Sequence, residues 1–159
     1  MQKLIQGILD FRRRLRPSYA ETFARLALGQ APDTLMIACS DSRVVPNLFA
    51  STDPGDLFVV RNVGNFVPPF EGADARDRAA GAAVEFATQV LGVAHVVVVG
   101  HSECGAMRTL LTGGVPASAP TLASWLELGR PAVARLSEGI LDEHPTHDRL
   151  SQLNVLQQL

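Results

Sequence analysis

A thiol, a carboxylate and a guanidinium stand at alternating positions where an apolar stretch of the chain ends. The segment "IACSDSRVVP" (residues 37–46) places Cys39 at the end of that stretch, with Asp41 and Arg43 two and four positions further on. Alternate residues of an extended segment point to the same side of the backbone. We therefore expect these three side chains to share one face, and we interpret the segment as one half of a reaction centre.

A second group of metal-binding residue types lies in "GHSECGAM" (residues 100–107), which follows another apolar stretch. His101 and Cys104 are three positions apart, so they share a face in the first turn of a helix. Thiolates and imidazoles together favour Zn²⁺, whereas Ca²⁺ and Mg²⁺ prefer oxygen ligands. Three protein ligands, Cys39, His101 and Cys104, leave a fourth tetrahedral position for water, which is the arrangement of a catalytic zinc site.

The carboxylate of Asp41 has two possible roles in such a site. It fills the fourth position on the metal and closes the site, or Arg43 holds it off the metal in a charge-assisted pair. The remaining histidines, His95, His144 and His147, are interpreted as structural or solvated. The glycine spacing of "GHSECG" resembles a phosphate loop, but no Lys-Ser/Thr pair follows the second glycine, so nucleotide binding is not predicted.

The composition of the chain limits the classes of protein to consider. Its 159 residues, 47% hydrophobic and 19% charged, suit one globular domain. The net charge of −2 argues against a nucleic-acid partner. The longest apolar run is too short to span a membrane, and Arg12 to Arg14 follow apolar residues without a cleavage site, so we expect no secretory leader and a cytoplasmic protein.

The apolar periodicity predicts an α/β fold with a mostly parallel central sheet flanked by helices. Short apolar runs predict strands buried on both faces of the sheet over residues 34–39, 57–60 and 95–100. Helical spacing predicts a helix over residues 76–91, another from Cys104, and a helical N-terminal arm over residues 1–29 that is interrupted at Pro17. Sites in such sheets form beyond the carboxyl ends of the strands, where both motifs lie.

Three stretches in this order, "CSDSRVVP", "GDLFVVRNVGNFVPP" and "GHSECGAM", resemble the β-class carbonic anhydrases of the plant-like and bacterial branch. The resemblance runs from Gly29 to at least Met107, and more weakly to the end of the chain. It implies a zinc enzyme that interconverts carbon dioxide and bicarbonate as a homodimer or an assembly of dimers. It also implies the three zinc ligands and the Asp41 and Arg43 pair that the spacing predicts independently.

The resemblance further implies the residues of a substrate pocket. Gln30 matches a glutamine that reaches across the dimer interface to hydrogen-bond the substrate. Phe58 and Val63 match apolar walls of the pocket, and Phe86 stands where relatives commonly have tyrosine. Gly105 matches the position where a backbone amide approaches the pocket.

The resemblance also sets the expected domain and two alternative functions. Relatives usually continue beyond "NVLQQL", so we expect a single domain over residues 1–159 with a shortened C-terminal end. One alternative is hydrolysis of carbon disulfide or carbonyl sulfide on the same metal site. The other is a zinc-binding assembly domain without catalysis. The presence of Asp41, Arg43 and Gln30 argues against the second, because a structural zinc site needs neither the pair nor the amide.

Overall fold

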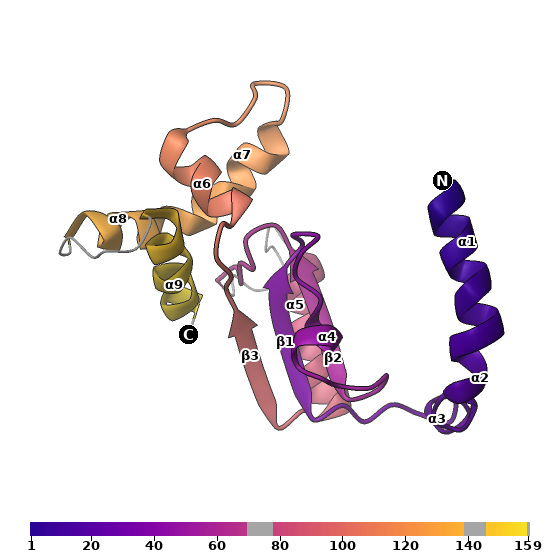
Figure 1. Cartoon of the computed structure of the whole chain (residues 1–159). Helices are drawn as coiled ribbons and strands as arrows, with labels where there is room; N and C mark the ends of the chain where they lie inside the picture. Colours follow the sequence, from indigo (N-terminus) through magenta and orange to yellow (C-terminus); the bar gives the residue numbers. More distant parts are fainter. Residues whose placement is uncertain (70–77, 139–145, 159) are drawn as a thin grey trace.

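A parallel sheet forms the centre of the molecule (Figure 1). The computed structural model describes residues 1–69, 78–138 and 146–158. In these residues the strands are β1 (Thr34–Cys39), β2 (Leu57–Asn62) and β3 (His95–Val99). Their order is β2-β1-β3 and both pairings are parallel, with Cys39 opposite Asn62 and Ala38 opposite Val99. The predicted α/β class is therefore confirmed.

One face of the sheet is covered by the helix that connects β2 to β3. This helix comprises α5 (Arg78–Glu85) and the π-helical turns η3 (Phe86–Leu91), and it ends at Gly92 with φ 66°. Leu35 and Ile37 of β1 pack against it together with Ala87. The predicted helix over residues 76–91 is confirmed from Arg78 onward, and residues 76 and 77 lie outside the described residues.

The carboxyl ends of the strands lie beside a second layer of helices. These are α6 (Gly105–Thr112), α7 (Pro120–Leu126), the 3₁₀ turn η4 (Glu127–Gly129), α8 (Arg130–Glu138) and α9 (Thr146–Gln158). The short helix α4 (Pro46–Phe49) belongs to the connection between β1 and β2. The core between these helices and the strand ends contains Cys39, Phe66, Cys104, Met107, Leu126 and Leu150. Burial of these apolar side chains holds the loops that follow β1 and β3 against each other.

Only β1 has the burial predicted for all three strands. Residues 35–39 of β1 are buried, because β1 pairs on both sides and helices cover its faces. The expectation was wrong for β3, where Val96 is 48% and Val97 38% exposed. Within the described part of the chain, β2 and β3 each pair with β1 alone, so each has one open edge.

The N-terminal arm is helical and extends away from the sheet (Figure 1). It consists of α1 (Gln2–Asp10), the π-helical turn η1 (Phe11–Leu15), α2 (Arg16–Ser18) and α3 (Ala20–Leu26). The interruption falls at Tyr19, with φ −102° and ψ 13°, and not at the predicted Pro17. Proline is tolerated in the first turn of a helix, where its missing N–H is not needed, and Pro17 is the second residue of α2.

Candidate metal centre

The two motifs meet at the carboxyl end of the sheet because β1 and β3 are neighbouring parallel strands. Cys39 is the last residue of β1, and the loop after β3 carries His101 and Cys104. The sulfur atoms and the imidazole nitrogen of these three residues all lie within 4.8 Å of one another. Both cysteines are free and buried. The structure therefore places the three predicted ligands in one cluster.

The imidazole of His101 is oriented as a metal ligand requires. Its Nδ1 lies 2.8 Å from the carbonyl oxygen of Ser102. A carbonyl oxygen only accepts, so Nδ1 carries the hydrogen and Nε2 carries a lone pair. That Nε2 is buried and has no hydrogen-bond partner. A buried imidazole nitrogen beside two buried sulfurs is the donor set that suits Zn²⁺.

The two thiols of the cluster have opposite acidities. A hydrogen bond from Cys104 lowers the pKa of the Cys39 thiol to about 4, assisted by the backbone N–H groups of Asp41 and Gly64 and opposed by burial. The Gly64 nitrogen lies 3.4 Å from the Cys39 sulfur. The same thiol pairing, together with burial, raises the pKa of Cys104 above its ordinary value. Without metal, the pair therefore holds one thiolate and one thiol at neutral pH.

Asp41 and Arg43 form a two-pronged ion pair beside the cluster. Arg43 donates from Nε to Oδ1 of Asp41 at 2.9 Å and from Nη2 to Oδ2 at 2.8 Å. The Arg43 amide also donates to Oδ1, at 3.0 Å. These bonds hold the pKa of Asp41 well below its usual range. In this structure the carboxylate is bound by Arg43 and is not part of the metal-binding cluster.

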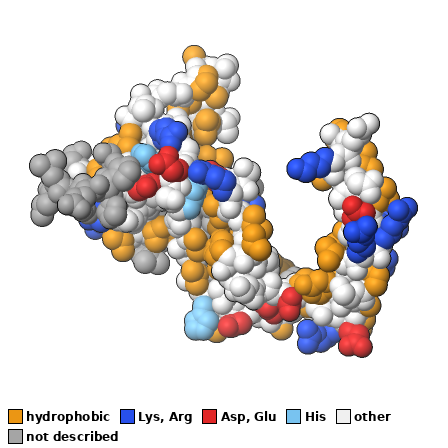
Figure 2. Space-filling model, in the orientation of Figure 1, with side chains coloured by type: hydrophobic (Ala, Val, Ile, Leu, Met, Phe, Trp, Pro, Cys, Tyr) orange, Lys and Arg blue, Asp and Glu red, His pale blue; other side chains and the backbone are white. Residues whose placement is uncertain are grey.

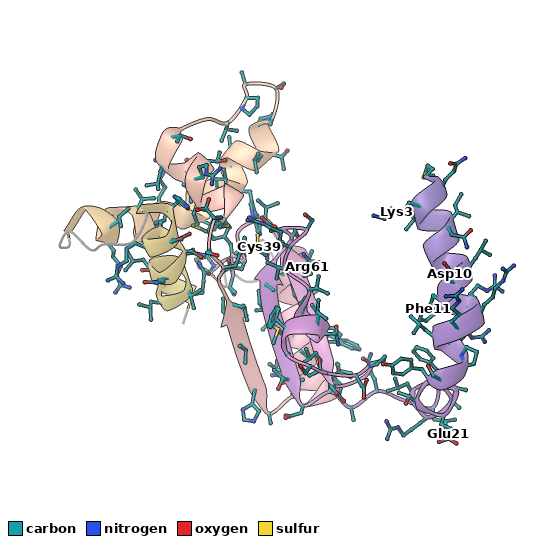
Figure 3. All side chains as sticks on the ribbon, viewed as in Figure 1. Lys3, Asp10, Phe11, Glu21, Cys39 and Arg61 are labelled. Carbon is teal, nitrogen blue, oxygen red and sulfur yellow. The ribbon has the colours of Figure 1, made fainter. Side chains whose placement is uncertain are left out.

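Two polar residues at the end of β2 hold the backbone around the cluster, and they were not predicted from the sequence. Arg61 donates from Nε to the Cys39 carbonyl at 3.0 Å and from Nη2 to the Asp41 carbonyl at 2.7 Å. Figure 3 shows Cys39 and Arg61 at the same end of the sheet. The Asn62 side chain bonds both the N–H and the carbonyl of Phe66, at 2.9 and 2.8 Å. Both are the last residues of β2 and directly follow its apolar run, residues 57–60, and this position is the signal that could have identified them.

Helix α9 provides further contacts to the loops around the cluster. Asn154 is fully buried and donates to the Gly64 carbonyl at 3.1 Å. Gln158 accepts from the amide of Val67 at 2.7 Å. Each bond joins positions about ninety residues apart in the chain, so no local sequence pattern reveals them.

Two of the predicted pocket residues lie near the cluster. Val63 follows β2 and is 42% exposed, and its carbonyl accepts from the Trp125 indole at 2.7 Å. A cavity of about 470 Å³ is lined in part by Val63, Trp125 and Leu122. Gly105 begins α6 directly after Cys104.

The other three predicted pocket residues lie toward the opposite end of the strands. Phe58 pairs with Leu35, four positions before Cys39 on β1. Its ring stacks on that of Phe86, with centroids 5.8 Å apart. Gln30 is exposed and precedes β1. Four residues of strand correspond to about 13 Å, so these side chains do not line the cluster of their own chain.

The parallel sheet with a Cys/His/Cys cluster at its carboxyl edge defines an α/β protein with a candidate metal centre. The family model for carbonic anhydrase matches residues 34–159. The chain is 42% identical to a carbonic anhydrase of Pseudomonas aeruginosa over 163 aligned positions, covering 100% of this chain and 71% of the relative. It is 41% identical to a carbonic anhydrase of Synechococcus elongatus, covering 98% of this chain and 55% of the relative.

Solved structures show the same class. The β-carbonic anhydrase CcaA matches with a TM-score of 0.91 at 37% identity, over 99% of this chain and 71% of that one. A tetrameric β-carbonic anhydrase from Sordaria macrospora matches with a TM-score of 0.82 at 32% identity, over 99% and 77%. The chain belongs to the carbonic anhydrase family, in its β class. In the described residues no helix has the length and apolar character needed to cross a membrane.

Proposed function

We propose that this chain catalyses the reversible hydration of carbon dioxide to bicarbonate and a proton, with Zn²⁺ held by Cys39, His101 and Cys104. The observation that carries the proposal is the buried cluster of two sulfurs and one unpartnered imidazole nitrogen beside the Asp41 and Arg43 pair. Membership of the carbonic anhydrase family supports the reaction. A purely structural zinc site has no use for an ionised carboxylate held next to it.

The residues of this chain supply orientation and charge for the reaction. When bound, Zn²⁺ supplies the Lewis acidity that makes water nucleophilic near neutral pH. Asp41 would accept a hydrogen bond from the attacking water and so orient it toward carbon dioxide. Arg43 keeps Asp41 ionised and turned away from the metal through its two-pronged pair.

Carbon dioxide is apolar and needs an apolar approach to the nucleophile. The cavity that contains Val63, Leu122 and Trp125 provides such walls beside the carboxyl end of β2. Gly105 supports a polar contact from its backbone amide at the first turn of α6, where N–H groups lack partners within the helix. We assign these residues to the part of the pocket that each chain supplies to its own metal.

A second copy of the chain completes the pocket in this proposal. Gln30, Phe58 and Phe86 lie at the far end of the strands from their own cluster. Gln30 and Phe86 are also exposed, so they are available to a neighbouring copy. The tetrameric structure among the relatives supports assembly into dimers. Gln30 of one chain then donates to a bicarbonate oxygen in the site of the other.

Metal content and hydration rate measured on the same variants test the proposal. Cys39→Ala and His101→Ala should lose zinc and activity together, because each removes a ligand. Asp41→Asn should keep its zinc and lose most of its activity. Arg43→Ala frees the Asp41 carboxylate to reach the metal, so it should keep zinc and become inactive. Elemental analysis beside an absorption-based carbon dioxide hydration assay gives both readouts.

The alternatives predict different results in the same assays. Complete loss of zinc from Asp41→Asn would show that this carboxylate is a structural ligand. Turnover of carbonyl sulfide or carbon disulfide without carbon dioxide hydration would assign the site to the hydrolase alternative. Zinc at full occupancy with no turnover of any of the three gases would assign it to a non-catalytic zinc domain.

A further inference from the structure

Glu103 lies between His101 and Cys104 in the sequence. Its backbone amide, its carbonyl and its carboxylate each have a polar partner. Its backbone has φ 53°, in the left-handed region that residues with side chains seldom adopt. Its amide donates to Oδ1 of Asp148 at 2.6 Å, and its carbonyl accepts from Nη2 of Arg43 at 2.8 Å. Its carboxylate pairs with Arg108 and lies 3.0 Å from Nε2 of His147. These contacts keep the loop in an uncommon conformation.

The carbonyl of Glu103 and the carboxylate of Asp41 share one donor atom. Nη2 of Arg43 lies 2.8 Å from both. The position of the Glu103 carbonyl therefore helps to set where the guanidinium sits, and the guanidinium holds Asp41. A continuous series of hydrogen bonds thus runs from Asp148 on α9 through Glu103 and Arg43 to Asp41.

Asp148 is the strongest anchor in this series. Its side chain is 22% exposed, whereas the carboxylate of Glu103 and the guanidinium of Arg108 are 47% and 57% exposed. Exposed ion pairs contribute little because water and salt compete for both partners. A carboxylate that accepts a backbone N–H at short distance in a partly buried place makes a stronger, charge-assisted bond.

Figure 2 shows acidic, basic and histidine side chains gathered on the body of the molecule. Helix α9 also packs closely against the loop that carries Glu103. A methyl group added at Gly100, at the start of that loop, would lie 2.8 Å from Val155 and 2.9 Å from Ser151 of α9. The helix that carries Asp148 is therefore fixed relative to the loop, and its carboxylate meets the Glu103 amide without a rearrangement.

We propose that Asp148 is a positioning residue for the metal centre. It holds the Glu103 backbone so that Arg43 binds Asp41 and keeps that carboxylate away from the metal. The expected effect of Asp148 on catalysis rests on the proposed function. Its expected effects on the loop and on metal coordination do not depend on which reaction the protein catalyses. The Asp148 carboxylate accepts from the Glu103 amide and lies 3.5 Å from Nε2 of His147, so it acts on the metal centre through other residues.

Substitutions at Asp148 separate the hydrogen bond from the charge. Asp148→Ala removes the acceptor for the Glu103 amide, and Asp148→Ser shortens the side chain so that its hydroxyl oxygen falls short of that amide. Asp148→Asn keeps an oxygen at the same position that can accept the bond. In the zinc-loaded protein, hydrogen exchange of the Glu103 amide should speed up about 10- to 100-fold in the Ala and Ser variants and stay near wild type in the Asn variant. Glu127→Ala is the matched control, because it also removes a carboxylate, one that pairs with Arg130 on the surface.

Cobalt substitution reports on the metal coordination directly. The visible spectrum of Co²⁺-loaded Asp148→Ala should move toward that of Arg43→Ala, in which Asp41 is free to bind the metal. Adding Asp41→Asn to Asp148→Ala should abolish that movement. In hydration assays kcat should fall with KM unchanged, and Asp148→Asn should recover most of the rate. Recovery by Asn alone distinguishes positioning from general destabilisation.

Several results decide the proposal. Unchanged amide exchange and an unchanged cobalt spectrum in both Asp148→Ala and Asp148→Ser would overturn it. A second equivalent of bound zinc that disappears in Asp148→Ala would also overturn it, because Glu103, His147 and Asp148 would then be metal ligands. If wild type hydrates no carbon dioxide while exchange and spectrum change as expected, the proposed function fails and the positioning role stands.

Discussion

The behaviour of Asp41 depends on the groups that surround it. A free carboxylate two residues from Cys39 would be a competent metal ligand. Two side-chain hydrogen bonds and one backbone hydrogen bond from Arg43 occupy both of its oxygens instead. The same bonds keep its pKa well below the ordinary range, so it stays ionised at any pH at which the enzyme would work. One arginine thus decides whether this carboxylate closes the site or orients water.

The thiol pair gives a prediction at the residue scale. Because the pKa of Cys39 is about 4 and that of Cys104 is raised, metal-free protein should show one thiolate per chain at neutral pH, by ultraviolet absorption. The thiolate should disappear as the pH falls through about 4. The folded-state pKa of Cys39 lies below the ordinary thiol value of 9.0. Ionisation of Cys39 therefore stabilises the fold fully above pH 9.0, and this stabilisation is lost as the pH falls from there to about 4.

The Cys104→Ala variant provides the control for this titration. The hydrogen bond from Cys104 is the largest cause of the lowered Cys39 pKa. Its removal should therefore move the thiolate titration upward, toward the ordinary value. Two thiolates in neutral wild-type protein, or an unchanged midpoint in Cys104→Ala, would show that the thiols do not share a proton.

At the scale of elements, α9 forms hydrogen bonds with both loops that surround the metal-binding cluster. Asp148 binds the loop after β3, and Asn154 and Gln158 bind the loop after β2. These two loops are far apart in sequence, and α9 joins both at the carboxyl end of the sheet. Buried polar groups that are paired in this way favour one arrangement, because any displacement leaves donors or acceptors without partners.

The close packing of α9 gives a prediction for Gly100. Gly100→Ala would bring a methyl group to 2.8 Å from Val155 and 2.9 Å from Ser151, so α9 or the loop must move. We expect the free energy of unfolding, measured by urea denaturation, to fall by about 1–3 kcal/mol. Zinc affinity should fall as well, because His101 is the next residue.

Gly81→Ala is the matched control for this substitution. Gly81 lies inside α5, and a methyl group there would meet nothing within 4 Å. Alanine is the better helix former, so this variant should gain about 0.5–1 kcal/mol. Equal changes in the free energy of unfolding in the two variants would show that the close packing of α9 against Gly100 does not affect stability.

At the scale of the whole molecule, the first helix of the arm carries exposed apolar side chains. Figure 2 shows apolar side chains along it, and Phe11 is labelled on the arm in Figure 3. No residue of α1 is buried, and Leu4, Ile5 and Ile8 are 62%, 54% and 52% exposed. An apolar surface of this kind marks a site of association. It is consistent with the proposed dimer, in which each copy completes the pocket of the other.

Complementation between two impaired variants tests the shared pocket. Gln30→Ala should lower activity from one side of the interface, and Asp41→Asn should abolish it from the other. In a mixed dimer of the two, one site has both substitutions and the other has neither. Equal amounts reassembled at random should regain about one quarter of the wild-type activity, because half of the dimers carry one intact site. Activity no higher than the sum of the separate variants would place Gln30 and Asp41 in the same chain's site.

Much of the fold and the cluster could be predicted from local patterns. The strand and helix positions follow from apolar spacing, which reports burial directly, so β1 was found at its observed bounds and α5 with η3 within the predicted helix. Cys39, His101 and Cys104 were recognisable because few residue types bind zinc and each motif ends an apolar run. Arg61 and Asn62 were missed because their position directly after an apolar run is their one signal, and residues that bond backbone groups have no distinctive type or spacing beyond it.

The sequence by itself determined which side chains could do the chemistry and that they follow the strands of an α/β sheet, because residue type and periodicity are local properties. Only the tertiary structure decided that β1 and β3 are neighbours, that Arg43 holds Asp41, and that Asp148 holds Glu103. It also separated Phe58 and Phe86 from the cluster of their own chain. These facts depend on strand order and on contacts between distant segments, which are set by packing of the whole chain rather than by any single stretch of it.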